Sequence, residues 1–252
     1  MGRLQDRVAI VTGAGQGIGR VYVERLLQEG ARCVIAEIDG ALGERTAAEL
    51  RAAGHDCLSV PTDVASLASC QQMAERTLAQ YGRIDILVNN AALFIALPQR
   101  PWDEFPEEEW DRCMAVNVRG VYYACRAVVP AMKRQGKGKI INISSTTTML
   151  ARPLRLNYVT AKAGVIGLTR ALAAEVSGYG INVNCIAPGL VMSEGALATY
   201  PPEFFERFRT LQLIKRNLRP EDLAGVVVFL ASDDSDMMTA QTLVVDGGLV
   251  MH

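Results

Sequence analysis

The chain has 252 residues, half of them apolar, and its 26 basic and 27 acidic side chains give a formal net charge of -1. The length suits one large α/β domain, and neither sign of charge is in the excess that indicates nucleic acid or an anionic membrane as a partner. No apolar run reaches the roughly 18 residues that span a bilayer, and the first strand comes too early for a secretory leader. We therefore expect a cytoplasmic protein.

The six cysteines are scattered, without a C-x-x-C pair, and the only histidines are His55 and His252. Buried free thiols in a reducing compartment suit this spacing better than disulfides do. Two histidines leave little for a zinc site or a histidine-based triad, so we expect no metal.

Short β-branched segments alternate with helix-sized segments along the whole chain. Strands are predicted at 8–11, 33–36, 58–61, 86–89, 139–144, 182–187 and 243–245. Helices are predicted at 18–28, 41–53, 67–81, 107–132, 158–177 and 220–231. Apolar strands joined by helical crossovers indicate a parallel sheet that is covered on both faces. The sequence thus predicts a doubly wound, Rossmann-type α/β fold with a mostly parallel sheet of seven strands.

No linker or low-complexity segment divides the chain, so residues 1–252 are interpreted as a single domain. Two segments, 92–106 and 192–217, lack a regular pattern of apolar residues. Long excursions from a compact domain are often lids or binding loops. We expect the second excursion to cover the substrate.

Aromatic residues are present in both excursions. Phe204, Phe205 and Phe208 repeat at helical spacing, which suits a substrate lid and simple packing equally well. Phe94 and Trp102 in the first excursion are candidates for contact with an apolar substrate.

A glycine-rich turn connects the first predicted strand to the first helix. Gly13, Gly17 and Gly19 fit G-x-x-x-G-x-G, whereas Ile18 takes the third glycine's place in G-x-G-x-x-G. Such glycines let the backbone approach a diphosphate, and the helix N-terminus adds free N–H groups. A plain turn is the alternative, but the position directly after the first strand favours dinucleotide binding.

Glu37 follows the second predicted strand, twenty residues after Gly17. A carboxylate there accepts hydrogen bonds from the adenosine ribose hydroxyls and repels a 2′-phosphate. No basic residue is adjacent to it, and Gln16 stands in the glycine turn where a basic residue could meet that phosphate. These features favour NAD over NADP; the alternative is a solvated charge at the strand end, with Asp39 capping the next helix.

Tyr158 and Lys162 are four residues apart in a predicted helix and therefore share one face. The ammonium favours the phenolate, so we expect a lowered pKa for Tyr158, which suits proton exchange with an alcohol. Ser145, thirteen residues earlier, could hold the reacting oxygen beside the phenol. Ser144 is its rival, although that hydroxyl suits backbone groups at the strand end better.

These motifs, in this order, resemble those of the short-chain dehydrogenase/reductase family over essentially the full length. Residues 12–19 match its glycine motif, and Asn89 and Asn90 match its Asn-Asn-Ala-Gly segment, with Ala92 in place of the last glycine. Catalytic roles are implied for Asn117, Ser145, Tyr158 and Lys162. Contacts with the cofactor are implied for Gly13, Gln16, Gly17, Ile18, Gly19, Glu37, Asp63, Val64, Asn90, Tyr158, Lys162, Val191 and Ser193.

The resemblance also implies how the catalytic residues work. Tyr158 exchanges the carbinol proton, and Ser145 binds the substrate oxygen. Lys162 holds the nicotinamide ribose and keeps Tyr158 partly ionised. Asn117 distorts its helix and holds a water that links Lys162 to solvent.

The implied function is that of an NAD-dependent oxidoreductase interconverting a secondary alcohol and a ketone. A loose analogy in the C-terminal run 241–252 suggests a hydrophobic, cyclic or aryl substrate. The alternative is a 3-oxoacyl-thioester reductase acting on acyl carrier protein. Glu37 argues against its usual NADPH, and the sequence shows no basic patch for an acidic carrier.

A non-catalytic binding or regulatory protein is a third possibility, against which Ser145, Tyr158 and Lys162 argue together. Members of the family commonly form tetramers through the long middle helices and the C-terminal segment. We therefore expect a homotetramer that binds a small alcohol or ketone, without a nucleic-acid or membrane partner.

Overall fold

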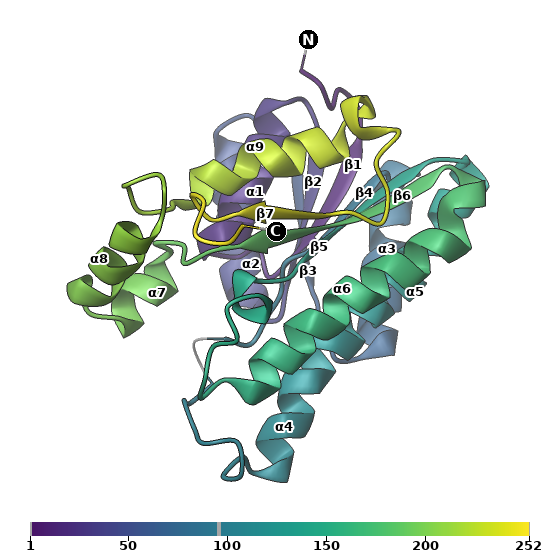
Figure 1. Cartoon of the computed structure of the whole chain (residues 1–252). Coiled ribbons are helices and arrows are strands. Elements are labelled where there is room, and N and C mark those ends of the chain that lie inside the picture. The colour runs from purple at the N-terminus through teal and green to yellow at the C-terminus, as the bar shows by residue number, and fades with distance from the viewer. Residues whose placement is uncertain (1, 95–96, 252) are drawn as a thin grey trace.

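The computed structural model describes residues 2–94 and 97–251. Seven parallel strands form one sheet in the order β3-β2-β1-β4-β5-β6-β7, and helices cover both of its faces (Figure 1). The strands are β1 (Val8–Thr12), β2 (Arg32–Glu37), β3 (Cys57–Pro61), β4 (Ile86–Asn89), β5 (Gly138–Ile143), β6 (Ile181–Pro188) and β7 (Thr242–Val245). The predicted fold class is confirmed.

The strand order reverses beside β1, which pairs with β2 on one side and β4 on the other. In doubly wound folds ligands bind at this switch point, outside the carboxyl ends of the strands. The α-helices are α1 (Gly17–Gln28), α2 (Gly40–Ala52), α3 (Leu67–Tyr81), α4 (Glu107–Met114), α5 (Gly120–Gln135), α6 (Leu156–Val176), α7 (Glu194–Thr199), α8 (Pro202–Leu211) and α9 (Pro220–Ala231). Within the described residues, none of them is both long and apolar enough to cross a membrane.

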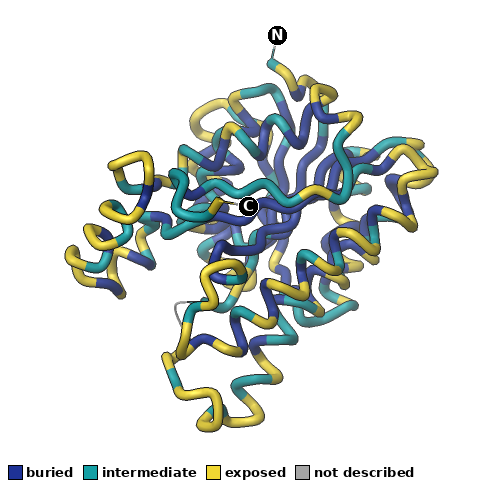
Figure 2. Tube along the Cα trace, in the orientation of Figure 1, coloured by how far each residue is buried: buried dark blue, intermediate teal, exposed yellow. Residues whose placement is uncertain are grey.

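The core lies on the two faces of the sheet. Every residue of β1 and β5 is buried, as expected for central parallel strands, and Figure 2 shows the sheet dark blue at the centre. One apolar cluster joins the sheet to α1 and α9, and a second joins it to α3, α5 and α6. All six cysteines are free and buried, as predicted.

The helix predicted at 107–132 is interrupted by a π-helical turn, η1 (Ala115–Arg119). Asn117 lies in this turn, fully buried, and its side chain pairs with the backbone of Leu93: Oδ1 accepts from the Leu93 N–H at 3.0 Å and Nδ2 donates to the Leu93 carbonyl at 3.0 Å. Isolated π-turns within α-helices often mark functional sites. The expected distortion at Asn117 is therefore present, and it fixes the start of the 92–106 excursion.

The 192–217 excursion contains two helices, α7 and α8, that the sequence pattern does not predict. Ser193 caps α7 by accepting from the Ala196 N–H at 3.3 Å, and Pro202 opens α8, where its missing N–H costs nothing. The described residues of the 92–106 excursion contain no helix or strand.

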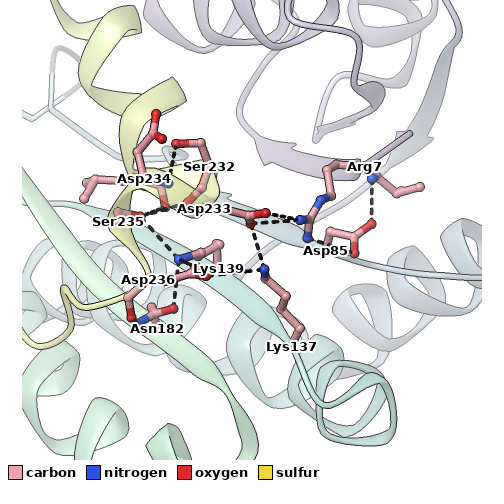
Figure 3. A network of polar contacts seen from close by, with 12 residues as sticks. Arg7, Asp85, Lys137, Lys139, Asn182, Ser232, Asp233, Asp234, Ser235 and Asp236 are labelled. Atoms are coloured by element: carbon pink, nitrogen blue, oxygen red, sulfur yellow. Dashed lines mark hydrogen bonds and ion pairs between the residues drawn. The ribbon is translucent and has the colours of Figure 1, made fainter. Parts of the chain in front are cut away.

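A polar network, here called the amino-end cluster, lies where β1, β4, β5 and β6 begin (Figure 3). Lys139 of β5 is 2% exposed, and its ammonium donates to Asp236 Oδ1 at 2.7 Å, Asn182 Oδ1 at 2.9 Å and Ser235 Oγ at 3.3 Å. Arg7 and Lys137 both pair with Asp233, at 2.8 Å and 2.7 Å. The cluster includes Arg7, Asp85, Lys137, Lys139, Asn182, Asp233, Ser235 and Asp236.

Candidate active site

A cleft of about 1120 Å³ lies at the opposite edge of the sheet. Its lining takes residues from the segment that follows each of β1 to β6, for example Gly13, Ile38, Asn90 and Gly189. This is the ligand-binding edge of a doubly wound fold. The cleft exceeds the roughly 300–1,000 Å³ of a typical small-molecule pocket, so it has room for a cofactor together with a substrate.

The glycine turn forms one end of the cleft. Gly17 has a φ of +60°, and nothing lies within 4 Å of the place where a Cβ would be, whereas a Cβ at Gly19 would meet the Gly13 carbonyl oxygen at 2.4 Å. Gln16 makes no side-chain cap to α1, and no acidic residue occupies its first turn. The first N–H groups of α1 therefore remain available for an anion, and this cradle fits the diphosphate of a dinucleotide.

Glu37 lies beside that turn with 8% of its surface exposed. Its Oε2 accepts from the Gly15 N–H at 3.0 Å and its Oε1 from the Ile38 N–H at 2.9 Å. The alternative of a solvated charge at the strand end is therefore wrong, since the carboxylate is fixed in the wall of the cleft. Because Oε1 also accepts from the Asp39 N–H at 3.3 Å, the oxygen that keeps a lone pair for a ribose hydroxyl is Oε2. Asp39 does cap α2, by accepting from the Leu42 N–H at 3.0 Å.

Every residue predicted to contact the cofactor lines this one cleft. Asn90 also holds the glycine turn in place, because its Nδ2 donates to the Thr12 and Gly13 carbonyls, each at 3.0 Å. Asp63 is fixed by accepting from the Ala65 N–H at 2.9 Å. Of the four predicted catalytic residues, only Asn117 lies behind the wall and not in it.

The other end of the cleft brings Ser145, Tyr158 and Lys162 together. Tyr158 and Lys162 lie on α6, with 7% and 2% of their surfaces exposed. The Lys162 ammonium lies 5.7 Å from the Tyr158 ring centroid and donates to the Ile143 carbonyl at 2.8 Å. It therefore lies beside the phenol without a hydrogen bond to it.

Burial shifts the pKa values of both groups on α6. It raises the pKa of Tyr158, and the Ser145 hydroxyl and the Arg155 cation offset only part of that rise. The expectation of a lowered Tyr158 pKa is wrong for this structure, because desolvation outweighs the neighbouring charges. Burial also lowers the pKa of Lys162, to about 8.

The two candidate serines have different partners. Ser144 Oγ donates to the Lys162 carbonyl at 2.8 Å and is 2% exposed, so it satisfies a backbone group, as predicted. Ser145 Oγ accepts from the Thr147 N–H at 3.2 Å and lines the cleft beside Tyr158. Its hydroxyl is also close enough to the Tyr158 phenol to lower the pKa of that phenol in part.

Aromatic side chains close part of the substrate end. Phe94 packs on Tyr158 with ring centroids 4.7 Å apart, and Phe208 of α8 lines the cleft. Phe204 instead stacks on Tyr200 at 4.4 Å, so the aromatic cluster of the second excursion both lines the cleft and packs within the excursion. Trp102 is 76% exposed and outside the cleft, and the hypothesis that it contacts the substrate is wrong.

Sequence reasoning missed two arginines near this end, Arg152 and Arg155. Arg155 is 2% exposed and donates to the Leu97 carbonyl at 2.7 Å, the Phe94 carbonyl at 2.9 Å and the Tyr200 hydroxyl at 3.0 Å. Its place three residues before Tyr158, at the N-cap of α6, is the signal that could have found it.

Comparisons with known proteins found relatives over nearly the whole chain. A protein-family model described as "Enoyl-(Acyl carrier protein) reductase" matches residues 13–250. The protein named "Probable galactose dehydrogenase GalD" from Rhizobium meliloti (strain 1021) is 39% identical over 251 residues, which cover 98% of this chain and 96% of that protein.

Two solved structures are similar to the whole chain. One is a 3-ketoacyl-(acyl-carrier-protein) reductase from Brucella melitensis complexed with NADH, with a TM-score of 0.91, 34% identity, and coverage of 98% of this chain and 100% of that one. The other is a gluconate 5-dehydrogenase from Burkholderia cenocepacia J2315 in complex with NADP and tartrate, with a TM-score of 0.92, 36% identity, and coverage of 98% and 96%.

Proposed function

Because the chain belongs to the short-chain dehydrogenase/reductase family, whose members act on CH–OH groups with nicotinamide cofactors, we propose that it interconverts a secondary alcohol and a ketone with NAD. One observation carries this proposal: Ser145, Tyr158 and Lys162 line the same cleft as the glycine turn and Glu37. The Ser145 hydroxyl and the Tyr158 phenol can then act on one substrate oxygen beside a bound dinucleotide, with the Lys162 ammonium beside the phenol.

A bound nicotinamide supplies the hydride acceptor or donor, at its C4 carbon. Tyr158 gives a proton to the carbonyl oxygen in reduction and takes it from the hydroxyl in oxidation. The raised pKa keeps its phenol protonated at neutral pH, as ketone reduction requires. Ser145 donates its O–H to the same substrate oxygen and so holds that oxygen beside the phenol.

Lys162 supports these steps from behind. Its ammonium stabilises a Tyr158 phenolate and can donate to the nicotinamide ribose. Asn117 positions Leu93, a residue of the cleft wall, through its two hydrogen bonds to the Leu93 backbone. As part of the proposal, Asn117 also holds a water that links Lys162 to solvent.

Tyr158→Phe tests the mechanism, because it removes the proton and preserves the ring that packs on Phe94. Turnover of the best substrate in a panel of secondary alcohols and ketones, followed by nicotinamide absorbance, should fall about 10²-fold or more. NADH binding, followed by fluorescence, should change little. Full turnover in this variant would rule out the proposed role of Tyr158.

The preference for NAD rests on the fixed carboxylate of Glu37, because the two solved relatives contain NADH in one case and NADP in the other. Glu37→Gln removes the charge that repels a 2′-phosphate, and the affinity for NADPH relative to NADH should rise about 10-fold. Asp39→Asn is the matched control, since it alters a neighbouring exposed carboxylate that caps α2. Equal affinities in the unmodified protein would contradict the NAD assignment.

We propose a hydrophobic, cyclic or aryl substrate, supported by the aromatic rings at the substrate end. Reduction of a 3-oxoacyl thioester on acyl carrier protein is the alternative, favoured by the likeness to the Brucella melitensis reductase. Including acetoacetyl thioesters in the panel separates the two. Faster turnover of the thioester than of every free ketone would favour the alternative.

We also propose that the chain is one domain and forms a cytoplasmic homotetramer. Leu213, Ile214 and Met251, near the C-terminal segment, are 66%, 58% and 79% exposed, and Tyr122 on α5 is 48% exposed. Such apolar groups suit burial between copies. The six buried thiols suit a reducing compartment. A monomer in light scattering would contradict the tetramer.

A further inference from the structure

Arg152 lies in the wall of the cleft, in the segment between Ser145 and α6. Its guanidinium carbon lies over the rings of Phe204 and Phe208, 5.0 Å and 5.9 Å from their centroids. Within residues 2–94 and 97–251, no carboxylate comes within the 4.0 Å of an ion pair and no side-chain hydrogen bond engages this guanidinium. Its charge is therefore held by aromatic faces alone.

The nearby arginines are in different situations. Arg155, buried behind the wall, donates to two carbonyls and the Tyr200 hydroxyl. Arg112 lines the cleft but is exposed, so water solvates its charge. Arg152 is half-buried, and burial together with the Arg155 charge lowers its pKa. A partly desolvated cation without a counterion attracts an anion more strongly than a solvated one does.

The geometry selects the kind of anion. The aromatic rings cover a face of the guanidinium and leave the donors at its edge, whose fork matches the two oxygens of a carboxylate. One such cation balances one negative charge, and Glu194, which also lines the cleft, disfavours a second. Both points favour a carboxylate over a phosphate.

We propose that Arg152 binds a carboxylate of the substrate, so that the preferred substrates are hydroxy acids and oxo acids, with the acid group apart from the reacting carbon. This inference deepens the proposed function and rests on it, because the bound carboxylate belongs to a substrate only if the protein catalyses the proposed reaction. Arg152 then determines specificity, while Tyr158 acts on the alcohol.

The first test compares matched pairs that differ in the carboxylate: 4-acetylbenzoate with 4-methylacetophenone, and levulinate with 2-hexanone. The readout is the ratio of kcat/KM for the acid to that for its neutral partner. Arg152→Met should lower this ratio about 10- to 100-fold for at least one pair, the loss expected for a charge-assisted hydrogen bond. Arg152→Lys keeps the charge without the fork and should retain part of the preference.

The matched control is Arg207→Met. Arg207 is an exposed arginine of α8 whose charge acts on Arg152 and which does not line the cleft. This control should leave the ratio unchanged within about twofold, since a distant solvated charge is screened. An equal fall of the ratio in both variants would show that the overall positive charge of the region, and not a contact with Arg152, causes the preference, and it would overturn the assignment.

The second test is binding without turnover. The melting temperature of the NADH complex should rise more with each favoured acid than with its neutral partner, and Arg152→Met should abolish the difference. Acid-selective binding that depends on Arg152 without turnover would retain the carboxylate site while refuting the proposed reaction. Turnover with no acid preference in any pair would retain the proposed reaction and refute the carboxylate site. An Arg152-dependent preference for acetoacetyl-coenzyme A over every free acid would also overturn the carboxylate assignment.

Discussion

Two lysines, Lys139 and Lys162, mark the two ends of strand β5, and both are 2% exposed. Lys139, at the amino end, has the Asp236 carboxylate at 2.7 Å and two further acceptors. Lys162 contacts the last carbonyl of the strand, Ile143, at 2.8 Å, and among the described residues no carboxylate lies within 4.0 Å of it.

This difference in counterions assigns the buried lysine at one end of the strand to stability and the one at the other end to function. At the amino end the chain supplies the counterions itself, so the ion pairs connect the strands to residues 233–236, which follow α9. At the carboxyl end the cation has no counterion and its pKa falls to about 8. An uncompensated buried cation costs folding free energy and remains free to act on a ligand.

The sharpest way to break this comparison is to remove each ammonium and measure turnover. Lys162→Met should lower kcat/KM about 10²-fold or more, because the phenolate loses its neighbouring cation. Lys139→Met should leave kcat/KM within about twofold, since Lys139 lies at the other edge of the sheet. Comparable losses in both variants would show that the loss of a buried lysine, and not its position, causes the effect.

The next prediction concerns pH and stability. Because the pKa of Lys162 is lowered in the folded protein to about 8, the unfolded chain binds a proton more readily between that pH and the ordinary lysine value of 10.5. The free energy of unfolding of the unmodified protein, relative to Lys162→Met, should therefore rise by about 3 kcal/mol as the pH rises through this window. Urea denaturation of both proteins measures it, and a flat difference would contradict the lowered pKa.

A smaller loss is expected at the amino end. Lys139→Met keeps the buried stem and removes the ammonium, and the free energy of unfolding at pH 7 should fall by about 1–3 kcal/mol. Asp236 is not stranded by this change, because it is 48% exposed and also lies 3.5 Å from Lys137. Urea denaturation checks the value, and a gain in stability would mean that burial of Lys139 costs more than its partners return.

The smallest effect belongs to the carboxylate of that pair. Asp236→Asn should cost less than about 1 kcal/mol, since the amide oxygen can still accept from the Lys139 ammonium, which also keeps its bonds to Asn182 and Ser235, and the charge that is lost is half-exposed. The cost should shrink further in high salt. A cost above that of Lys139→Met would show that the acid, and not the buried lysine, organises the amino-end cluster.

The sequence predicted what depends on nearby residues. The strands, the crossovers, the glycine turn and the Tyr158–Lys162 pair each follow from a local pattern, and the structure has all four. The resemblance to the family implied a distortion at Asn117, but the local pattern did not show its cause, because the side chain of Asn117 pairs with Leu93, 24 residues away. The amino-end cluster was missed for the same reason, since Lys139 and Asp236 are 97 residues apart.

Two properties of the site also depend on packing that the sequence pattern does not show. The pKa of Tyr158 is set by how completely the surrounding elements desolvate its phenol. The surroundings of Arg152 depend on α8, the helix of the second excursion that brings Phe204 and Phe208 against Arg152.

The strand order has a consequence for how the chain is made. Strand β1 emerges from the ribosome first; β2 and β3 then add outward on one side, and β4 to β7 on the other. No strand has to be inserted between two that are already paired, so the nascent sheet can grow at its edges during translation. The Arg7–Asp233 ion pair, which joins residues 226 apart, forms only when synthesis is nearly complete.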